Sequence, residues 1–382
     1  METINKKYKV TAQVLTPLSI GQGSENDWVY GVDYLVKTDL RNPQNKLLYH
    51  LDLNKMVAAG VDMVVMSNFL ASNNVQGVQN LVGNKLDKVS DFSIPLPNGI
   101  GNIGNNGNGL SNPVKTFLRN DLTNRPILAG SSLKGALRSV LFSDLRTNER
   151  DNASVFGDMK NGTDFMRFVR VGDFEFAETC LINTKIYNLH NESGPWQGGW
   201  KHKGGANGET TSRFKSIGFN TVYECLPPQA ISEGYIMFAD KLFSKVVPQG
   251  NVEEKKKILH DIIYLCDKIN DHTFEYLNKE LEFFQKYEQG EKCSQIEDCI
   301  KDIQNGIDAC EGNECILKMS AGAGFHSITG DWRFTDYTGN DGHTLGQGRY
   351  HRDLPKSRKI AVSGSNPFSL MGFIKLTFTE TK

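Results

Sequence analysis

The chain has 382 residues, and its 43 Lys and Arg residues against 44 Asp and Glu residues give a formal net charge of −1. This length excludes a short peptide module and fits two or three modest domains, and the charge balance excludes a basic field over the whole molecule. Any nucleic-acid surface must therefore be local. With 38% hydrophobic and 23% charged residues, the composition is that of a folded globular chain.

The first half of the sequence begins with a strand pattern. Val10, Ala12 and Val14 alternate with polar residues, which predicts a strand with one face in a core. Gly21 and Gly23 follow in a loop, where a simple turn explains them as well as a binding role does. A second strand is expected over residues 47–53, followed by a short helix from Lys55, with Asn54 as its cap. Residues 98–112 are almost entirely Asn and Gly and predict a flexible insertion.

The clearest predicted helix begins at Ser131 or Ser132, either of which can serve as an N-cap. Its apolar positions fall on one face, which is expected to pack against a core: Leu133, Ala136, Leu137, Val140, Leu141 and Leu145. Lys134 and Arg138 share a neighbouring stripe. Further strands are expected over residues 165–176, 181–189, 217–226, 231–239 and 371–378.

Residues 251–316 change in texture, with apolar residues at three- and four-residue spacing between many charges, and this predicts a helical insertion. Many short strands with few helices predict an α+β fold in which helices cover sheets. We expect one domain over residues 1–180, which carries the insertion at 98–112, and a second over residues 181–382, which carries the helical insertion.

The chain shows no sign of a membrane or export pathway. It has no run of about 18 uncharged apolar residues and no apolar signal core near the start, so we expect a cytoplasmic protein without a membrane partner. Its seven cysteines are an odd number, which argues against a disulfide framework. Cys293, Cys299, Cys310 and Cys315 are not spaced as paired Cys-x-x-Cys knuckles. We therefore expect small hydrophobic cysteines, no metal and no cofactor.

The most informative stretch runs from Gly130 to Arg138 and reads Gly-Ser-Ser-Leu-Lys-Gly-Ala-Leu-Arg. A helix start with free amides and two cations nearby attracts phosphate. From the residues alone, a well-capped helix with two surface cations is the commoner explanation. The order of residues is not that of a Walker A motif, so nucleotide hydrolysis is unsupported.

The same stretch resembles the G-S-S-[LI]-[KR]-G-x-[LIF]-R signature of the RAMP superfamily, the RNA-binding subunits of type III CRISPR effector complexes. Phe156-Gly157, Arg170-Val-Gly-Asp173 and Met371-Gly-Phe-Ile-Lys375 extend the resemblance along most of the chain. Within the superfamily the chain is most similar to the family of the fifth Csm protein, which caps the guide RNA at its 3′ end in type III-A complexes.

This resemblance implies two ferredoxin-like, RRM-related domains and a non-catalytic subunit. Its implied partners are the 3′ portion of CRISPR guide RNA, backbone RAMP subunits, the small helical subunit, target RNA indirectly, and host trimming nucleases. The residues implied to contact RNA are Gly21, Gly23, Gly130, Ser131, Ser132, Lys134, Arg138, Gly322, Gly324 and His326. A second candidate lies in the densest cationic segment, with a solvated loop as its equal alternative: Arg349, Lys356, Arg358 and Lys359.

Three further interpretations remain open at this point. Trp196 and Trp200 beside Lys201 and Lys203 suit either a thumb that stacks on RNA or an anchored loop, of which the anchor is favoured. An endoribonuclease of the same superfamily would draw on His326, His343 and His351 or on an acidic residue, Asp27 or Asp33. The chain also fits a RAMP subunit at another position of a Csm or Cmr complex.

Overall fold

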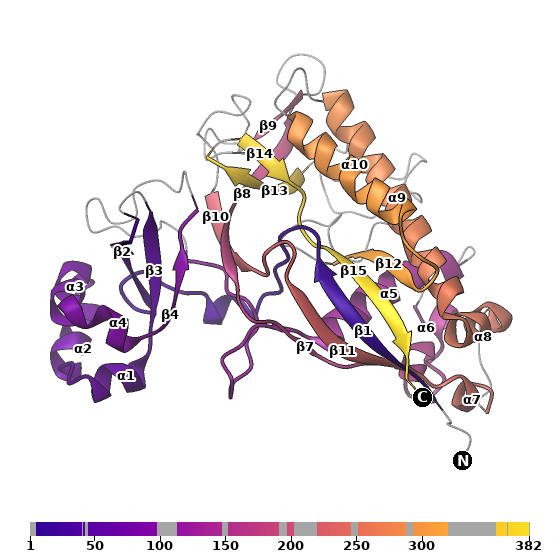
Figure 1. The fold of residues 1–382 in the computed structure, drawn as a ribbon, viewed down its shortest axis with the longest axis horizontal. Coiled ribbons are helices and arrows are strands. Elements are labelled where there is room, and N and C mark those ends of the chain that lie inside the picture. Colours follow the sequence, from indigo (N-terminus) through magenta and orange to yellow (C-terminus); the bar gives the residue numbers. More distant parts are fainter. Residues whose placement is uncertain are drawn as a thin grey trace.

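The computed structural model has the expected α+β architecture, with antiparallel sheets covered by helices (Figure 1). It describes residues 5–39, 41–42, 45–97, 113–146, 152–190, 197–201, 220–245, 251–287, 293–319, 357–364 and 366–381. The predicted flexible insertion at 98–112 lies outside these residues. Within them, no helix has both the length and the apolar character that a membrane span requires.

The central sheet has the order β12-β15-β1-β11-β6, and all its neighbouring strands are antiparallel. The bounds are β1 (Lys6–Val14), β6 (Val169–Val171), β11 (Ile231–Phe238), β12 (Glu314–Lys318) and β15 (Phe373–Glu380). The alternation seen in the sequence places Val10, Ala12 and Val14 of β1 in the core. The two ends of the chain lie close together beside this sheet (Figure 1).

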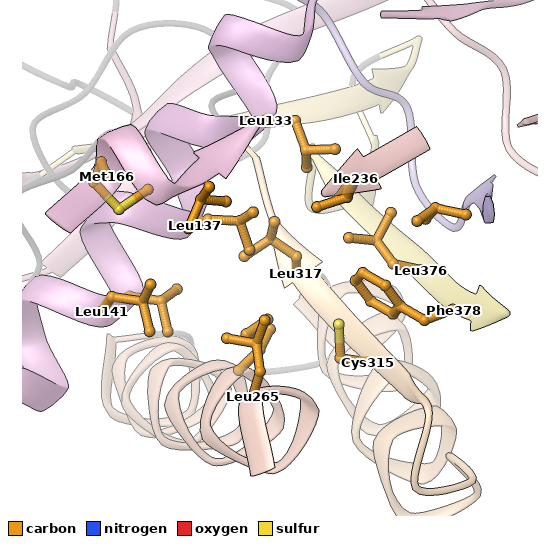
Figure 2. Close-up of a cluster of buried hydrophobic side chains, with 14 of the residues drawn as sticks. Leu133, Leu137, Leu141, Met166, Ile236, Leu265, Cys315, Leu317, Leu376 and Phe378 are labelled. Atoms are coloured by element: carbon orange, nitrogen blue, oxygen red, sulfur yellow. The ribbon is translucent and has the colours of Figure 1, made fainter. Parts of the chain in front are cut away.

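Two helices cover the inner face of the central sheet. They are α5 (Gly130–Leu145) and α9 (Ile262–Tyr287), and Figure 2 shows Leu133, Leu137 and Leu141 of α5 gathered around the same interior as Leu265 of α9. Leu317 of β12 and Leu376 and Phe378 of β15 complete that interior. The apolar face predicted for α5 is therefore the face that packs on the sheet.

The order β1, α5, β6, β11, α9, β15 along the chain is the β-α-β-β-α-β succession of a ferredoxin-like unit, and β12 adds an edge strand. This unit takes its strands from both sides of residue 180. The division expected at that residue does not coincide with a boundary in the central sheet.

The second sheet has the order β10-β8-β13-β14, with β9 paired to β8. Its strands are β8 (Cys180–His190), β9 (Gln197–Trp200), β10 (Asn220–Cys225), β13 (Ser357–Ser363) and β14 (Asn366–Ser369). α9 and α10 (Ser294–Asp308) supply most of the hydrophobic cluster that includes Ile360 and Val362 of β13.

The predicted helical insertion is confirmed as α8 (Val252–His260), α9 and α10, with one correction. Its last residues, from Glu314, form β12 instead of helix, because Cys315 and Leu317 pair with β15 and point into the main core. The short helices α6 (Asn152–Phe156) and α7 (Asp240–Phe243) lie at the same end of the molecule as α8 (Figure 1).

A smaller unit contains β2 (Tyr34–Thr38), β3 (Lys46–Leu51) and β4 (Ser90–Pro95), with four helices and its own hydrophobic cluster. Its helices are α1 (Leu53–Ala58), α2 (Met63–Ala71), α3 (Val75–Val82) and α4 (Leu86–Val89). The helix expected from Lys55 begins at Leu53, because the Asp52 side chain accepts a hydrogen bond from the Lys55 amide and acts as the cap in place of Asn54.

Candidate nucleic-acid interface

The start of α5 differs from the predicted serine cap. The helix begins at Gly130, Ala129 occupies the N-cap position, and no side chain of the cap residue bonds to the helix. The amide of Gly130 instead donates to Oδ1 of Asp173 at 2.7 Å, and the amide of Ser132 donates to the Ala129 carbonyl at 3.0 Å. Ser131 and Ser132 therefore lie in the first turn, with Ser131 exposed, and part of the anion-binding capacity of this helix end is already used by Asp173.

Gly130 has a packing role that the sequence does not show. A Cβ atom at this position would lie 2.3 Å from the Val171 carbonyl oxygen and 2.7 Å from that of Gly172. Any larger residue would push α5 away from the turn between β6 and β7 (Phe174–Glu175). The glycine thus holds the helix start against the Arg170-to-Asp173 segment, which brings the two parts of the predicted signature together.

Three cations gather where α5 meets β6. Burial lowers the pKa of Lys134, Asp164 opposes this shift, and the charges of Arg138 and Arg170 reinforce it. Arg138 places Nη1 3.3 Å from Oδ2 of Asp164 and its guanidinium 4.2 Å from the centre of the Phe156 ring. Arg170 is exposed on β6. Three positive groups around one buried carboxylate leave a local positive charge that suits phosphate.

The two glycines of the first loop are placed beside the strand that leads into α5. Gly21 pairs with Phe117, and the adjacent Ile20 carbonyl accepts from the Leu118 amide at 3.1 Å. The Leu118 carbonyl in turn accepts from the amide of Ile127, the first residue of β5 (Ile127–Leu128). Gly21 and Gly23 are exposed, and Gly23 has φ 108°, which favours glycine.

Arg358 is not available to RNA, which corrects that prediction. Its Nε atom lies 2.9 Å from both carboxylate oxygens of Glu280, and its guanidinium lies 3.7 Å from the centre of the Phe283 ring. The side chains of Arg358 and Glu280 are only 8% and 1% exposed. The physical reason is the position of β13 beneath α9, which buries this face of the strand.

Lys359 points to the opposite face of β13 and is also engaged. Its Nζ atom donates to the Tyr223 hydroxyl and lies 4.2 Å from the centre of that ring. Burial, with a smaller contribution from Lys115, lowers its pKa to about 8. At neutral pH most of these side chains still carry a proton, but the group is held by the protein and is half-buried.

Several predicted residues fall outside the described part of the chain. These are Gly322, Gly324, His326, His343, Arg349, His351, Lys356, Trp196 and Lys203. Trp200 is described, and it is fully buried with its ring edge-on to Tyr187. For Trp200 the anchoring interpretation is therefore correct.

The residues considered for other chemistry have structural contacts. Oδ2 of Asp33 accepts from the Val29 amide at 2.7 Å, and Asp27 forms an ion pair with Lys115. Cys293 is buried in the cluster beneath α9 and α10, and Cys315 is buried in the main core. Across the described ranges, no group of three or more His, Cys, Asp or Glu residues is arranged to hold a metal ion.

Sequence reasoning missed Arg170, Asp164 and Asp173 as parts of the site. Arg170 and Asp173 stand in the stretch that carries part of the RAMP resemblance, so a signal for them existed. Asp164 carries no local signal, because only the packing of its 3-10 helix (Phe165–Phe168) against α5 brings it to Arg138.

Comparisons with known proteins agree with this geometry. A model of the RAMP superfamily matches residues 11–289. A chain in the "Cryo-EM structure of Csm-crRNA-target RNA ternary complex in type III-A CRISPR-Cas system" is similar in fold, with TM-score 0.63 and 16% identity over 97% of this chain and 100% of that one. The crystal structure of T. onnurineus Csm5 gives TM-score 0.60 and 15% identity over 95% and 99%. The search of curated proteins found no match.

Proposed function

Because the chain belongs to the RAMP superfamily, we propose that it is a non-catalytic subunit of a type III-A CRISPR effector complex that binds the 3′ portion of the guide RNA. In this role it caps the filament of backbone RAMP subunits, contacts the small helical subunit and meets target RNA indirectly. It supports guide maturation by recruiting trimming nucleases. The fold likeness to the chain of the Csm ternary complex and to Csm5, over nearly the whole chain, supports the proposal.

The observation that carries the proposal is the group of Lys134, Arg138 and Arg170 at the junction of α5 and β6. A guide RNA has a different spacer in each complex, so its holder must grip phosphates and leave the bases free to pair. Cations beside a helix start do this without reading sequence. The junction holds no aromatic platform among these residues, which agrees with gripping the backbone.

We also propose that the second sheet belongs to a second ferredoxin-like half of the molecule. Its strands β10, β8, β13 and β14 are antiparallel and lie under α9 and α10, as helices lie on one face of such a sheet. In this arrangement α9 serves both halves, since Leu265 packs in the main core and Phe284 in the cluster beside β13.

The proposal is tested by measuring guide RNA binding to the full chain as salt is varied. We expect the double variant Lys134→Ala, Arg170→Ala to weaken binding by a similar factor for every spacer, and to lower the slope of log K against log salt by about one. Arg138 is left in place, because its contacts with Asp164 and Phe156 would make its loss a structural change. Lys256→Ala on α8, a cation paired with Glu253, is the control.

An unchanged affinity and slope in the double variant would contradict this site. The enzyme alternative is separated by incubating the chain with labelled repeat RNA, with and without magnesium. Specific cuts that disappear in Asp33→Ala or His326→Ala would replace the proposed function with an endoribonuclease.

A further inference from the structure

A narrow hairpin projects from the body just before α5, and its tip is apolar. The bridge between Arg119 and Pro126 and the hydrogen bond from the Asn120 amide to the Arg125 carbonyl, 2.9 Å long, form its stem. In Figure 1 it is the narrow purple loop that points away from the sheets near β7. Leu122 stands at its tip and is 95% exposed, the highest exposure of any large hydrophobic residue in the described part of the chain.

The tip is held in one conformation by the hairpin itself. Oδ1 of Asn120 accepts from the amides of Leu122 at 2.9 Å and Thr123 at 3.3 Å. The Asn124 amide donates to the Asn120 carbonyl at 2.8 Å, and Nη1 of Arg119 donates to the Asn124 carbonyl at 2.7 Å. The backbone on both sides of Leu122 is therefore fixed without any partner.

Glu175 of β7 braces the same hairpin from the body. Its carboxylate accepts from the Thr123 hydroxyl at 3.2 Å and from Nη1 of Arg125 at 3.2 Å. At the root, Arg119 forms an ion pair with the fully buried Glu224. A side chain presented on such a support loses little conformational entropy when it binds, which is the property of a preorganised anchor.

Leu122 has no role in the fold, because it touches nothing that its exposure leaves room for. Single exposed apolar residues are common on protein surfaces and need no explanation when they lie on a helix face, as Val64 does on α2 at 73% exposure. Leu122 differs because it stands at the end of a braced projection. A turn built on Asn120 would form equally well with a polar residue at this position.

The charges around the tip favour a protein over RNA as the partner. Residues 120–124 contain no Lys or Arg, and Asp121 is exposed beside Leu122. The two stem arginines are already paired, Arg119 with Glu224 and Arg125 with Glu175. A phosphate chain approaching this tip would meet a carboxylate, whereas an apolar protein socket with a cationic rim would complement it.

We propose that Leu122 is an anchor residue that inserts into an apolar socket, bordered by Lys or Arg, on a neighbouring protein subunit. The inference rests on the proposed function in so far as a subunit of an effector complex has protein neighbours. It adds the surface through which this chain is attached. It separates attachment to protein at the hairpin from RNA binding at Lys134 and Arg170.

The first test is a titration of the assembly that lacks this chain, purified with its guide RNA, with the labelled full-length chain. We expect Leu122→Ala to weaken association about tenfold, Leu122→Asp to weaken it further, and Leu122→Met to remain near the unmodified chain. Val64→Ala is the matched control and is expected to change nothing. Equal affinity of Leu122→Asp and the unmodified chain would overturn the inference.

The second test identifies what lies against the tip. A photoreactive p-benzoylphenylalanine at position 122 is expected to crosslink to a protein subunit, and the same group at position 64 is not. A crosslink from position 122 to RNA, or no crosslink at all in the assembled complex, would overturn the inference.

The two proposals fail in different ways in these experiments. If the unmodified chain neither joins the assembly nor binds guide RNA, the proposed function is wrong and the inference falls with it. If the unmodified chain joins and the Leu122→Asp chain joins equally well, only the anchor is wrong. A third variant, Glu175→Ala, is expected to weaken association without altering the tip residue, because it removes the brace.

Discussion

Lys134, Arg358 and Lys359 look alike in the sequence, and each stands in a segment rich in cations. In the structure Lys134 lies at the open junction of α5 and β6, Arg358 is buried against Glu280, and Lys359 lies against Tyr223. The two residues from β13 occupy opposite faces of one strand, since successive side chains alternate. Which cations remain for a ligand is decided by what packs on each face.

Lys359 gives a prediction about pH at the scale of one residue. Its pKa falls from an ordinary value of 10.5 to about 8 in the folded protein, so between these values the unfolded chain binds more protons than the folded one. The free energy of unfolding therefore rises with pH through this window, and below pH 8 the buried charge has its full cost. We expect Lys359→Met to be more stable at pH 7, by up to about 3 kcal/mol, with the gain shrinking towards pH 10.5.

Chemical denaturation of both proteins at several pH values measures this difference. Lys255, whose pKa burial also lowers to about 8, titrates in the same window in both proteins and cancels in the comparison. Lys37→Met, at an exposed position on β2, is the control. A gain that stays constant from pH 7 to pH 10 would show that the charge of Lys359 is not its cause.

At the scale of the element, α5 joins the core to the candidate RNA interface. Its apolar face packs under the central sheet, while Lys134 and Arg138 lie on a neighbouring stripe. The position of its first turn is fixed by Gly130 against the carbonyls of Val171 and Gly172 and by the bond to Asp173. The helix therefore brings its cations to Arg170 through a contact that only glycine permits.

Two glycines of this helix provide a matched pair of substitutions. Gly130→Ala forces a Cβ within 2.3 Å of a carbonyl oxygen and is expected to destabilise the protein by about 1–3 kcal/mol. Gly135→Ala has no atom within 4 Å of the new Cβ and is expected to stabilise by up to about 1 kcal/mol, through helix propensity. Thermal unfolding of the two variants gives the comparison, and a stabilising Gly130→Ala would refute the packing role assigned to this glycine.

At the scale of the whole molecule, the helical block after residue 251 is part of the fold. Ile258 and Leu259 of α8 and Leu265 and Ile269 of α9 are buried in the same cluster as Val10 of β1. An appendage would bury its apolar face within itself, whereas these residues fill the main core. The word insertion therefore describes the sequence and not the architecture.

One residue pair of α9 tests this integration. Ile269 is fully buried and Ile263 is 52% exposed on the same helix. Ile269→Ala is expected to lower the free energy of unfolding by about 2–5 kcal/mol and to broaden no transition, since the core unfolds as a unit. Ile263→Ala is expected to change it far less. If Ile269→Ala instead produced a separate early transition with the rest of the molecule intact, the block would be an independent unit.

The sequence by itself determined the α+β class, the helices α5, α8, α9 and α10, most strands, and the RAMP resemblance, which is confirmed. These features depend on local periodicity and on one contiguous signature, so neighbouring residues carry them. The tertiary structure alone decided that β1 lies between β11 and β15, that Glu280 takes Arg358, and that Asp164 and Arg170 join Lys134. Contacts between residues more than 20 positions apart leave no periodic trace along a chain, and burial of a charge depends on which distant element covers it.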